Sequence, residues 1–434
     1  MGASLVLNSM CPEHSLQLPL ELCDHILCFL SDDLATLASC SLTCRAWLPT
    51  TRALTFRTLV VASEGSYRRA ERMLADHPHL TRCVRELHIA GASLVVYRSF
   101  SELFALVPSL PRLKHLRLHH WAFLGDQIAS NRTPPSPRAM FVSVRELTLH
   151  IVYPRALDLV RLIRACPNLR ALHFSVVLFR DANSLDIDAH SSEVSPPLET
   201  MSLETLTWRR SALFLLQWLL RGPAKLRIRN ISLAWGEDTK DAAHSSVPQG
   251  EEMDVALVVA RDTLREAGPT LVRLELCVDC SERHSLVDYG LSSCVNLRTV
   301  KLESSYRNRT PSSWAFDWIV HAIRQLNSGV LDSIEVGLGW ACDARPIAVG
   351  AIESLDHALV DLVKGKPTIS IALTVFEWSD ELVEEAARGF PGLRAAGVRF
   401  CVRMDPEATE RALLEAYPSL GDMCPSQSRV RWFP

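Results

Sequence analysis

Apolar residues recur at helical spacing between residues 18 and 57, beside residues that suit the start of a helix. Pro19 lacks the N–H that a first helical residue leaves unpaired, and Glu21 falls in the first turn, where the helix dipole favours an acidic residue. The apolar stripe that follows consists of Leu22, Ile26, Phe29 and Leu30. This pattern predicts a first helix that begins at Pro19.

Two more short helices are predicted in the same window. Residues 31–33 (Ser-Asp-Asp) carry N-cap chemistry, and Leu34, Leu37 and Ala38 continue the apolar stripe behind them. After residues 39–41 we predict a third helix with Cys44, Trp47 and Leu48 on the same side, ending at Pro49 or a few residues later. Roughly forty residues in three short helices bury too little apolar surface to be stable unaided. The stripe therefore needs a partner.

Beyond residue 57 the pattern changes to a short unit, Leu-x-x-Leu-x-Leu or a conservative version of it, which alternates as a strand does. Copies begin at Val84, Leu113, Val144, Leu169, Leu203, Ile228, Leu271, Leu297 and Leu331. Between copies, helical spacing appears at 67–77, 156–165, 213–220, 254–267 and 314–326. The unit is similar to that of leucine-rich repeats. Because successive starts lie between 25 (Val144 to Leu169) and 43 residues apart (Ile228 to Leu271), we expect an irregular solenoid.

The chain divides into four regions on these patterns. We predict a disordered tail at 1–17, the three helices at 18–57, a degenerate repeat solenoid at 58–346, and C-terminal repeats with a cap at 347–434. The last region is predicted to hold helices at 355–363, 379–388 and 405–417 and strands at 369–376 and 393–401. Loop compositions predict excursions at 127–137, 181–199 and 236–252, and we expect proteases to cut 181–199 first.

Composition narrows the functional classes. A net charge of −3 without a basic run argues against nucleic-acid binding as the main activity. No apolar run reaches spanning length, so we expect no membrane partner. The cysteines number 13 and are irregularly spaced, which indicates reduced thiols in a cytoplasmic and/or nuclear compartment.

A search for catalytic motifs finds none with its full pattern. The sequence has no Gly-x-Ser-x-Gly, no Walker-type loop and no His-Glu-x-x-His. Cys277 and Cys280 form a lone Cys-x-x-Cys, and neither this pair nor His14 nor His119-His120 has further ligands at metal-site spacing. We therefore predict no metal, no cofactor and no enzymatic activity. An enzyme whose site combines residues distant in sequence stays open as an alternative.

The N-terminal window resembles the F-box family, in which a Leu-Pro-x-Glu opening precedes apolar residues one and two turns on, an Asp-Leu, and a third helix with Cys and Trp. The matching residues are Leu18, Pro19, Glu21, Leu22, Ile26, Leu30, Leu34, Leu37, Cys44 and Trp47. The Ser-Leu-x-Cys-Arg-x-Trp ending looks like that of fungal members. Together with the repeats, the resemblance implies an α/β fold in which a three-helix F-box precedes an irregular leucine-rich-repeat solenoid.

For function, the resemblance implies docking on a Skp-type adaptor and, through it, on the cullin of a ubiquitin ligase. The rest of the chain would then bind an unknown protein substrate. The implied adaptor-binding residues are Leu18, Pro19, Leu22, Ile26, Leu30, Leu34, Leu37 and Trp47. Two alternatives stay open: a helical hairpin that caps the following domain, and a scaffold of the same architecture that acts outside a ligase.

Strand alternation predicts which side chains of each copy face outward: those at the third and fifth positions and the residue after the unit. The fifth position holds His88, Arg117, Thr148, His173, Thr207, Ser232, Glu275, Lys301 and Glu335. The following residue is Ala90, His119, His150, Ser175, Arg209, Ala234, Cys277, Glu303 or Gly337. Since histidine and arginine crowd the first half, we expect a more positive face there, increasingly so below about pH 6.5.

These columns suggest where a target binds. We hypothesise that an acidic or phosphorylated segment of the substrate lies across Arg117, His119, His150 and His173. The alternative is that these are solvated strand residues without a ligand.

Overall fold

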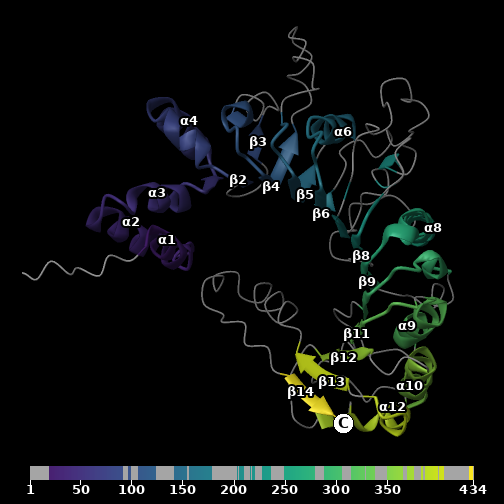
Figure 1. Cartoon of the computed structure of the whole chain (residues 1–434). Coiled ribbons are helices and arrows are strands. Elements are labelled where there is room, and N and C mark those ends of the chain that lie inside the picture. The colour runs from purple at the N-terminus through teal and green to yellow at the C-terminus, as the bar shows by residue number, and fades with distance from the viewer. Residues whose placement is uncertain are drawn as a thin grey trace, which may run out of the picture.

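The structure is a computed structural model that describes residues 19–90, 96–98, 106–123, 141–153, 156–177, 203, 205–209, 216, 218–219, 227–235, 249–278, 288–304, 314–327, 329–337, 349–364, 369–375, 383–384, 387–398, 400–404 and 430–433. The predicted tail at 1–17, Leu18, the loops at 127–137 and 181–199, most of the loop at 236–252 and the predicted helix at 405–417 lie outside the described residues. The described elements mix helices and strands, which confirms the α/β class. Three helices lead into a long arc of strands flanked by helices (Figure 1).

The N-terminal helices form the small unit expected from the apolar stripe. They are α1 (Leu20–Cys28), α2 (Leu34–Thr43) and α3 (Leu48–Thr55). Pro19 is the N-cap residue of α1, and the Asp33 carboxylate caps α2 by accepting a hydrogen bond from the Thr36 N–H at 2.9 Å. Cys23, Leu27 and Leu37 are buried among the helices, and Thr51 of α3 is also fully buried.

The predicted boundary between the second and third helices is wrong. Residues 39–41 lie inside α2, because the hydroxyls of Ser39 and Ser41 bond back to the carbonyls of Ala35 and Ala38, at 3.1 and 2.6 Å, without breaking the helix. Pro49 stands in the first turn of α3 and does not end it. Proline fits there because the first helical N–H has no intrahelical acceptor.

Within the described residues, fourteen strands form one sheet. They are β1 (Thr58–Val61), β2 (Glu86–Ala90), β3 (Val96–Arg98), β4 (His115–Phe123), β5 (Glu146–Tyr153), β6 (Ala171–Val177), β7 (Thr205–Arg209), β8 (Asn230–Trp235), β9 (Arg273–Val278), β10 (Thr299–Ser304), β11 (Ser333–Gly337), β12 (Ser370–Val375), β13 (Phe400–Met404) and β14 (Val430–Phe433). The strands pair in sequence order, except that β3 lies off this path beside β4. Pairing is parallel from β1 to β13, and β14 joins β13 antiparallel. Each of the nine predicted copies supplies one strand, which begins two residues after the start of the copy.

The pairing register places equivalent positions of the copies side by side. Glu86 pairs with His115, His115 with Glu146, and Glu146 with Ala171. The apolar positions of each unit are buried, as in Leu116, where none of the surface is exposed, and the positions between them are partly exposed. The predicted alternation is therefore confirmed. Uneven spacing between copies does not shift the register, because a slip of one residue would expose the apolar set.

Helices cover the outer side of the arc, and the strands line its inner side (Figure 1). The helices after the first three are α4 (Glu64–Asp76), α6 (Ala156–Arg164), α8 (Gln249–Ala267), α9 (Trp314–Gln325), α10 (Val349–Val363) and α12 (Pro391–Ala395). Short 3₁₀ helices lie at Pro78–Arg82, Val107–Ser109, Gly268–Thr270 and Leu291–Ser293. Of the predicted helix at 213–220, residues 216, 218 and 219 are described, and all three are helical. The core lies between the helices and the sheet, where the Trp318 ring meets Tyr289 edge-on at 5.9 Å between centroids.

Side chains in the turns before two strands tie neighbouring copies together. Asn168 donates its amide to the carbonyl of Val142 at 2.8 Å, and Asn296 donates in the same way to Pro269, also at 2.8 Å. Each asparagine stands one residue before its copy, and each acceptor stands two residues before the preceding copy. An otherwise unpaired turn carbonyl is satisfied in both places.

The C-terminal region follows the predicted pattern with one correction. Helix α10 contains the predicted helix at 355–363, and β12 matches the predicted strand at 369–376. The strand predicted at 393–401 begins only at Phe400, because Leu393 belongs to α12. Gly397 ends this helical stretch with a left-handed φ of +67°, which a residue with a side chain rarely adopts.

A buried carboxylate fixes the start of α12. Asp356 of α10 is only 3% exposed and accepts hydrogen bonds from the N–H groups of Gly392 and Leu393, at 2.6 and 3.0 Å. A Cβ on Gly392 would lie 2.6 Å from one Asp356 oxygen, so glycine is required for this close approach.

Candidate functional site

The three N-terminal helices expose a large apolar surface. Leu22 and Ile26 of α1 are 50% and 51% exposed, and Phe29, one residue past the end of this helix, is 76% exposed. Spacings of four and seven residues place these side chains on one face of a helix. Leu20, Leu34 and Leu42 are also large exposed apolar residues. Exposed apolar groups gathered on so small a unit are typical of a protein-binding surface.

The other predicted adaptor-binding residues differ in exposure. Pro19 is exposed, whereas Leu30 and Trp47 are half-buried. Leu37 is fully buried and holds the helices together, so its side chain offers no surface to a partner in this conformation. Phe29 and Leu42, which were not among the predicted contact residues, are the most exposed large apolar residues of this unit.

A second candidate surface is the inner face of the sheet at β2, β4, β5 and β6. The register aligns His88, Arg117, Thr148 and His173 in one row. In the next row His119 pairs with His150, and their rings lie 5.2 Å apart. The four predicted substrate-binding residues, Arg117, His119, His150 and His173, therefore lie in two adjacent rows on adjacent strands.

Two glutamates at the third position of their copies share this face, and the predicted columns had left them out. Glu146 accepts from His115 Nδ1 at 2.8 Å and lies 3.9 Å from His173 Nε2. Glu86 lies 3.6 Å from His88 Nε2 and also pairs with Arg57 at 3.2 Å. The expectation that the first half of the inner face is the more positive one left out these carboxylates, which offset the cations.

Two histidines of this face, His88 and His173, have lowered pKa values. Burial lowers the pKa of His88, Arg117 lowers it further, and Glu86 partly opposes the shift. Burial likewise lowers the pKa of His173, against the opposing effect of Glu146. Both side chains therefore take up a proton at a lower pH than an ordinary histidine, which corrects the expectation that they add charge from about pH 6.5 downward. Arg117 keeps its charge, and its buried Nε has no hydrogen-bond partner among the described residues.

The later strands carry a balanced set of charges on the same face. Lys301 lies 3.6 Å from Glu275 and 3.3 Å from Glu303, and Glu335 pairs with Arg403 and accepts from the Thr374 hydroxyl at 3.0 Å. These groups satisfy one another.

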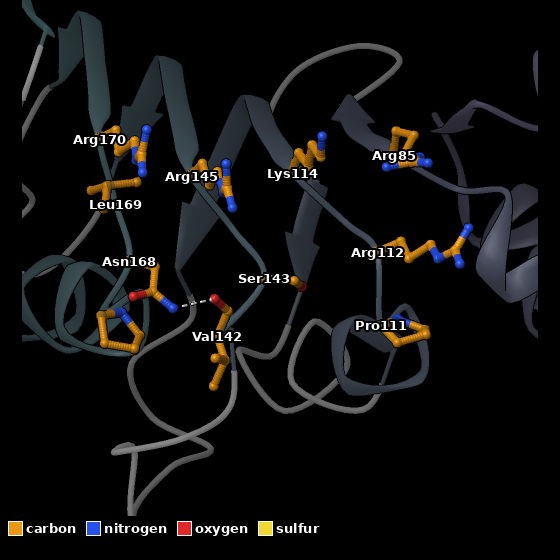
Figure 2. A pocket seen from close by; sticks show the side chains of 11 residues that line it. Arg85, Pro111, Arg112, Lys114, Val142, Ser143, Arg145, Asn168, Leu169 and Arg170 are labelled. Carbon is orange, nitrogen blue, oxygen red and sulfur yellow. Dashed lines mark hydrogen bonds between the residues drawn. The ribbon is translucent and has the colours of Figure 1, made fainter.

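A row of cations at the edge of the sheet was not predicted. It consists of Arg85, Lys114, Arg145 and Arg170, the second residue of four successive copies. We call it the basic edge. Figure 2 shows these four side chains, each from the residue just before one of the strands β2, β4, β5 and β6, with Arg112 nearby. They line a hollow of about 750 Å³. The columns read from the sequence were the fifth position and the residue after the unit, so this row at the second position was missed although its repetition is visible in the sequence.

The described residues show no sign of a metal or thiol centre. No group of three or more His, Cys, Asp or Glu side chains among them is placed to hold a metal ion. Burial raises the pKa of the Cys294 thiol to about 11 and that of Cys166 further still, so both stay protonated. Cys277 is half-buried, and Cys280 lies outside the described residues.

Comparison with known proteins identifies no relative of this chain. No model of a known protein family matches the sequence, and no curated protein matches it either. Among the described helices, none has both the length and the apolar character needed to cross a membrane. The site is therefore interpreted from its residues and their geometry.

Proposed function

We propose that the chain is a non-catalytic substrate receptor of a cullin–RING ubiquitin ligase. In this proposal residues 18–57 are an F-box that docks on a Skp-type adaptor, and the arc of strands is a degenerate leucine-rich-repeat solenoid that binds the target. One observation carries the proposal: an exposed apolar face on a three-helix unit whose sequence resembles the F-box pattern. Leu22, Ile26 and Phe29, each at least half exposed, are its centre.

The inner face of the sheet is the proposed target-binding surface. Arg117 supplies a buried N–H group without a partner among the described residues, and a buried donor of this kind favours a ligand that brings an acceptor. His119, His150 and His173 lie beside it and, when neutral, can both donate and accept hydrogen bonds. This surface suits a polar segment of a protein.

The experiment is co-purification of the full chain with a Skp-type adaptor. Ile26→Glu should abolish binding, because a carboxylate buried in the interface without a partner costs several kcal/mol. Val258→Glu is the matched control, since Val258, like Ile26, is a β-branched apolar residue of a helix, with 44% of its surface exposed, but lies on α8. Loss with Ile26→Glu alone supports the proposal. Equal recovery of the adaptor with both variants contradicts it.

A second arm of this experiment tests the target-binding surface. Proximity labelling in cells would compare the wild type with Arg117→Glu/His173→Ala and with Lys301→Glu. We expect the first variant to lose labelled proteins that the second retains. The opposite result would place the target at the later strands.

A further inference from the structure

The basic edge is built by the backbone of the sheet. The carbonyl of Arg85 accepts hydrogen bonds from the N–H groups of Lys114 and His115, at 2.7 and 3.0 Å. The Lys114 carbonyl does the same for Arg145 and Glu146, and the Arg145 carbonyl for Arg170 and Ala171. These bonds hold four cationic residues in one row across β2, β4, β5 and β6. The row is therefore a fixed feature of the fold.

The row lines an open hollow, and the described residues of its wall include cations and no acids. The hollow measures about 750 Å³, and Arg112, from the turn before β4, adds a fifth cation to its wall. The remaining lining residues, which include Val142, Ser143 and Asn168, carry no charge. Figure 2 shows the cationic side chains above these turn residues.

Four of the five cations of the hollow form no salt bridge within the described part of the chain. None of the salt bridges among the described residues involves Arg85, Arg112, Lys114 or Arg145. The nearest carboxylates along the chain, Glu86 and Glu146, are the next residues of their strands and have partners in Arg57, His88 and His115. Like charges held together in this way favour an anionic ligand.

We propose that the hollow along the basic edge binds an acidic, phosphorylated segment of a protein. Guanidinium groups bind phosphate through two parallel hydrogen bonds, and a lysine adds a point charge. At about 4.8 Å between strands, the four positions span roughly 14 Å, the length of about four or five extended residues. The hollow therefore fits two anionic groups that stand two to four residues apart.

The composition of the hollow favours a peptide over other polyanions. Single-stranded nucleic acids need aromatic side chains for stacking, and the lining residues include none. Anionic membranes are bound by basic surfaces with several inserted apolar groups, whereas Val142 is the one large exposed apolar residue among the described residues that line this hollow. The proposal goes beyond the proposed ligase function and does not depend on it, because adaptor docking involves the separate N-terminal helices.

The test measures binding of a fluorescein-labelled peptide to the full chain by fluorescence anisotropy. The peptide carries two phosphoserines three residues apart, flanked by glutamates, and is compared with its unphosphorylated form. We expect the phosphorylated form to bind at least about tenfold tighter, and Lys114→Glu/Arg145→Glu to weaken it by at least the same factor. Arg229→Glu is the matched control, because Arg229 is exposed and holds the second position of a later copy outside the hollow.

Each outcome decides the proposal. Loss of binding in the double variant with less than a twofold change in Arg229→Glu supports it. Equal loss in both variants, or equal binding of both peptides, overturns it. Thermal unfolding of every variant, and the milder Lys114→Gln/Arg145→Gln, separate loss of binding from loss of folding. Oligouridylate of equal charge and vesicles with anionic lipid are tested beside the phosphorylated peptide. If either binds more tightly than the peptide, the hollow belongs to that class of partner and the proposal of a peptide ligand is overturned.

Discussion

At the scale of single residues, the central feature is a charged side chain held among neutral ones. Arg117 lies between His88 of β2 and Thr148 of β5, and it lowers the pKa of His88 and of His173. Burial contributes more to both shifts than this charge does. The inner face therefore has a permanent cation beside two imidazoles whose pKa values lie below the ordinary value.

This arrangement predicts a stability that declines as the pH falls. Because the pKa values of His88 and His173 are lower in the folded chain than the ordinary 6.5, the unfolded chain binds more protons below that pH. Denaturant unfolding should therefore show a lower stability at pH 5.5 than at pH 7. In His88→Gln/His173→Gln the decline should be smaller, while the same change at the exposed His79 should leave it as in the wild type.

Charged and titratable groups on the neighbouring residues also act on the pKa values of these two histidines. Glu86, His115 and Arg117 act on His88, and Glu146 and Arg117 act on His173. A titration of the histidine ring protons by NMR would measure both pKa values directly. A value at or above 6.5 for either residue would contradict the assignment of burial as the dominant effect.

Sequence and structure agree best where a residue's place depends on alternation alone. The leucines of each copy and the outward columns, such as His88, Arg117 and His173, fall where the pattern puts them. Glu146 lies on a different strand from its partners His115 and His173, so a pattern read along one strand does not reveal these pairs. Glu86 lies on the same strand as His88, but the columns that were read left out the third position. The pKa shifts could not be predicted either, because they depend on burial by neighbouring strands.

At the scale of elements, polar contacts decide boundaries that apolar spacing does not. The serine hydroxyls of α2 continue this helix through a stretch that suggests a break, and Pro49 suits the start of α3 as well as an end. Strands β1, β3 and β14 were not predicted, because each has only three or four residues and none follows the repeated unit. These three strands are recognised only by their pairing with β2, β4 and β13.

The capping of α12 gives a prediction at this scale. Asp356→Ala would leave the buried N–H of Leu393 and the half-buried N–H of Gly392 without this acceptor, and it should lower the free energy of unfolding by about 2 kcal/mol. Asp361→Ala is the control on the same helix, since its pair with Lys364 is exposed to solvent and should matter little. Equal unfolding midpoints for the two variants would show that the cap contributes nothing.

At the scale of the whole molecule, the sheet is one continuous ladder. Each inner strand pairs with the strand before it and the strand after it, so no break separates the predicted regions at 58–346 and 347–434. Folding units of this kind depend on their neighbours for a covered core.

Cutting the ladder should therefore be harmful. A chain that ends at Gly250 loses β9 from the edge of β8, and it loses almost all of α8. We expect this chain to aggregate or to unfold without a cooperative transition, because it exposes an unpaired strand and an open core. Sedimentation and thermal unfolding beside the full chain would check this. A soluble, monomeric fragment with a sharp transition would contradict the continuous ladder.

The constant register has a consequence for how such a surface can change. Copies stand 25 to 43 residues apart, yet every strand meets its neighbour at the same position of the unit. The position of a residue on the inner face or on the basic edge thus depends on its place in the copy and not on the length of the connecting segment. The connecting segments can therefore lengthen without moving a surface residue, and single surface residues can be substituted one at a time. One residue inserted inside a strand would instead turn the core-facing side chains beyond it toward the surface, and the surface side chains toward the core.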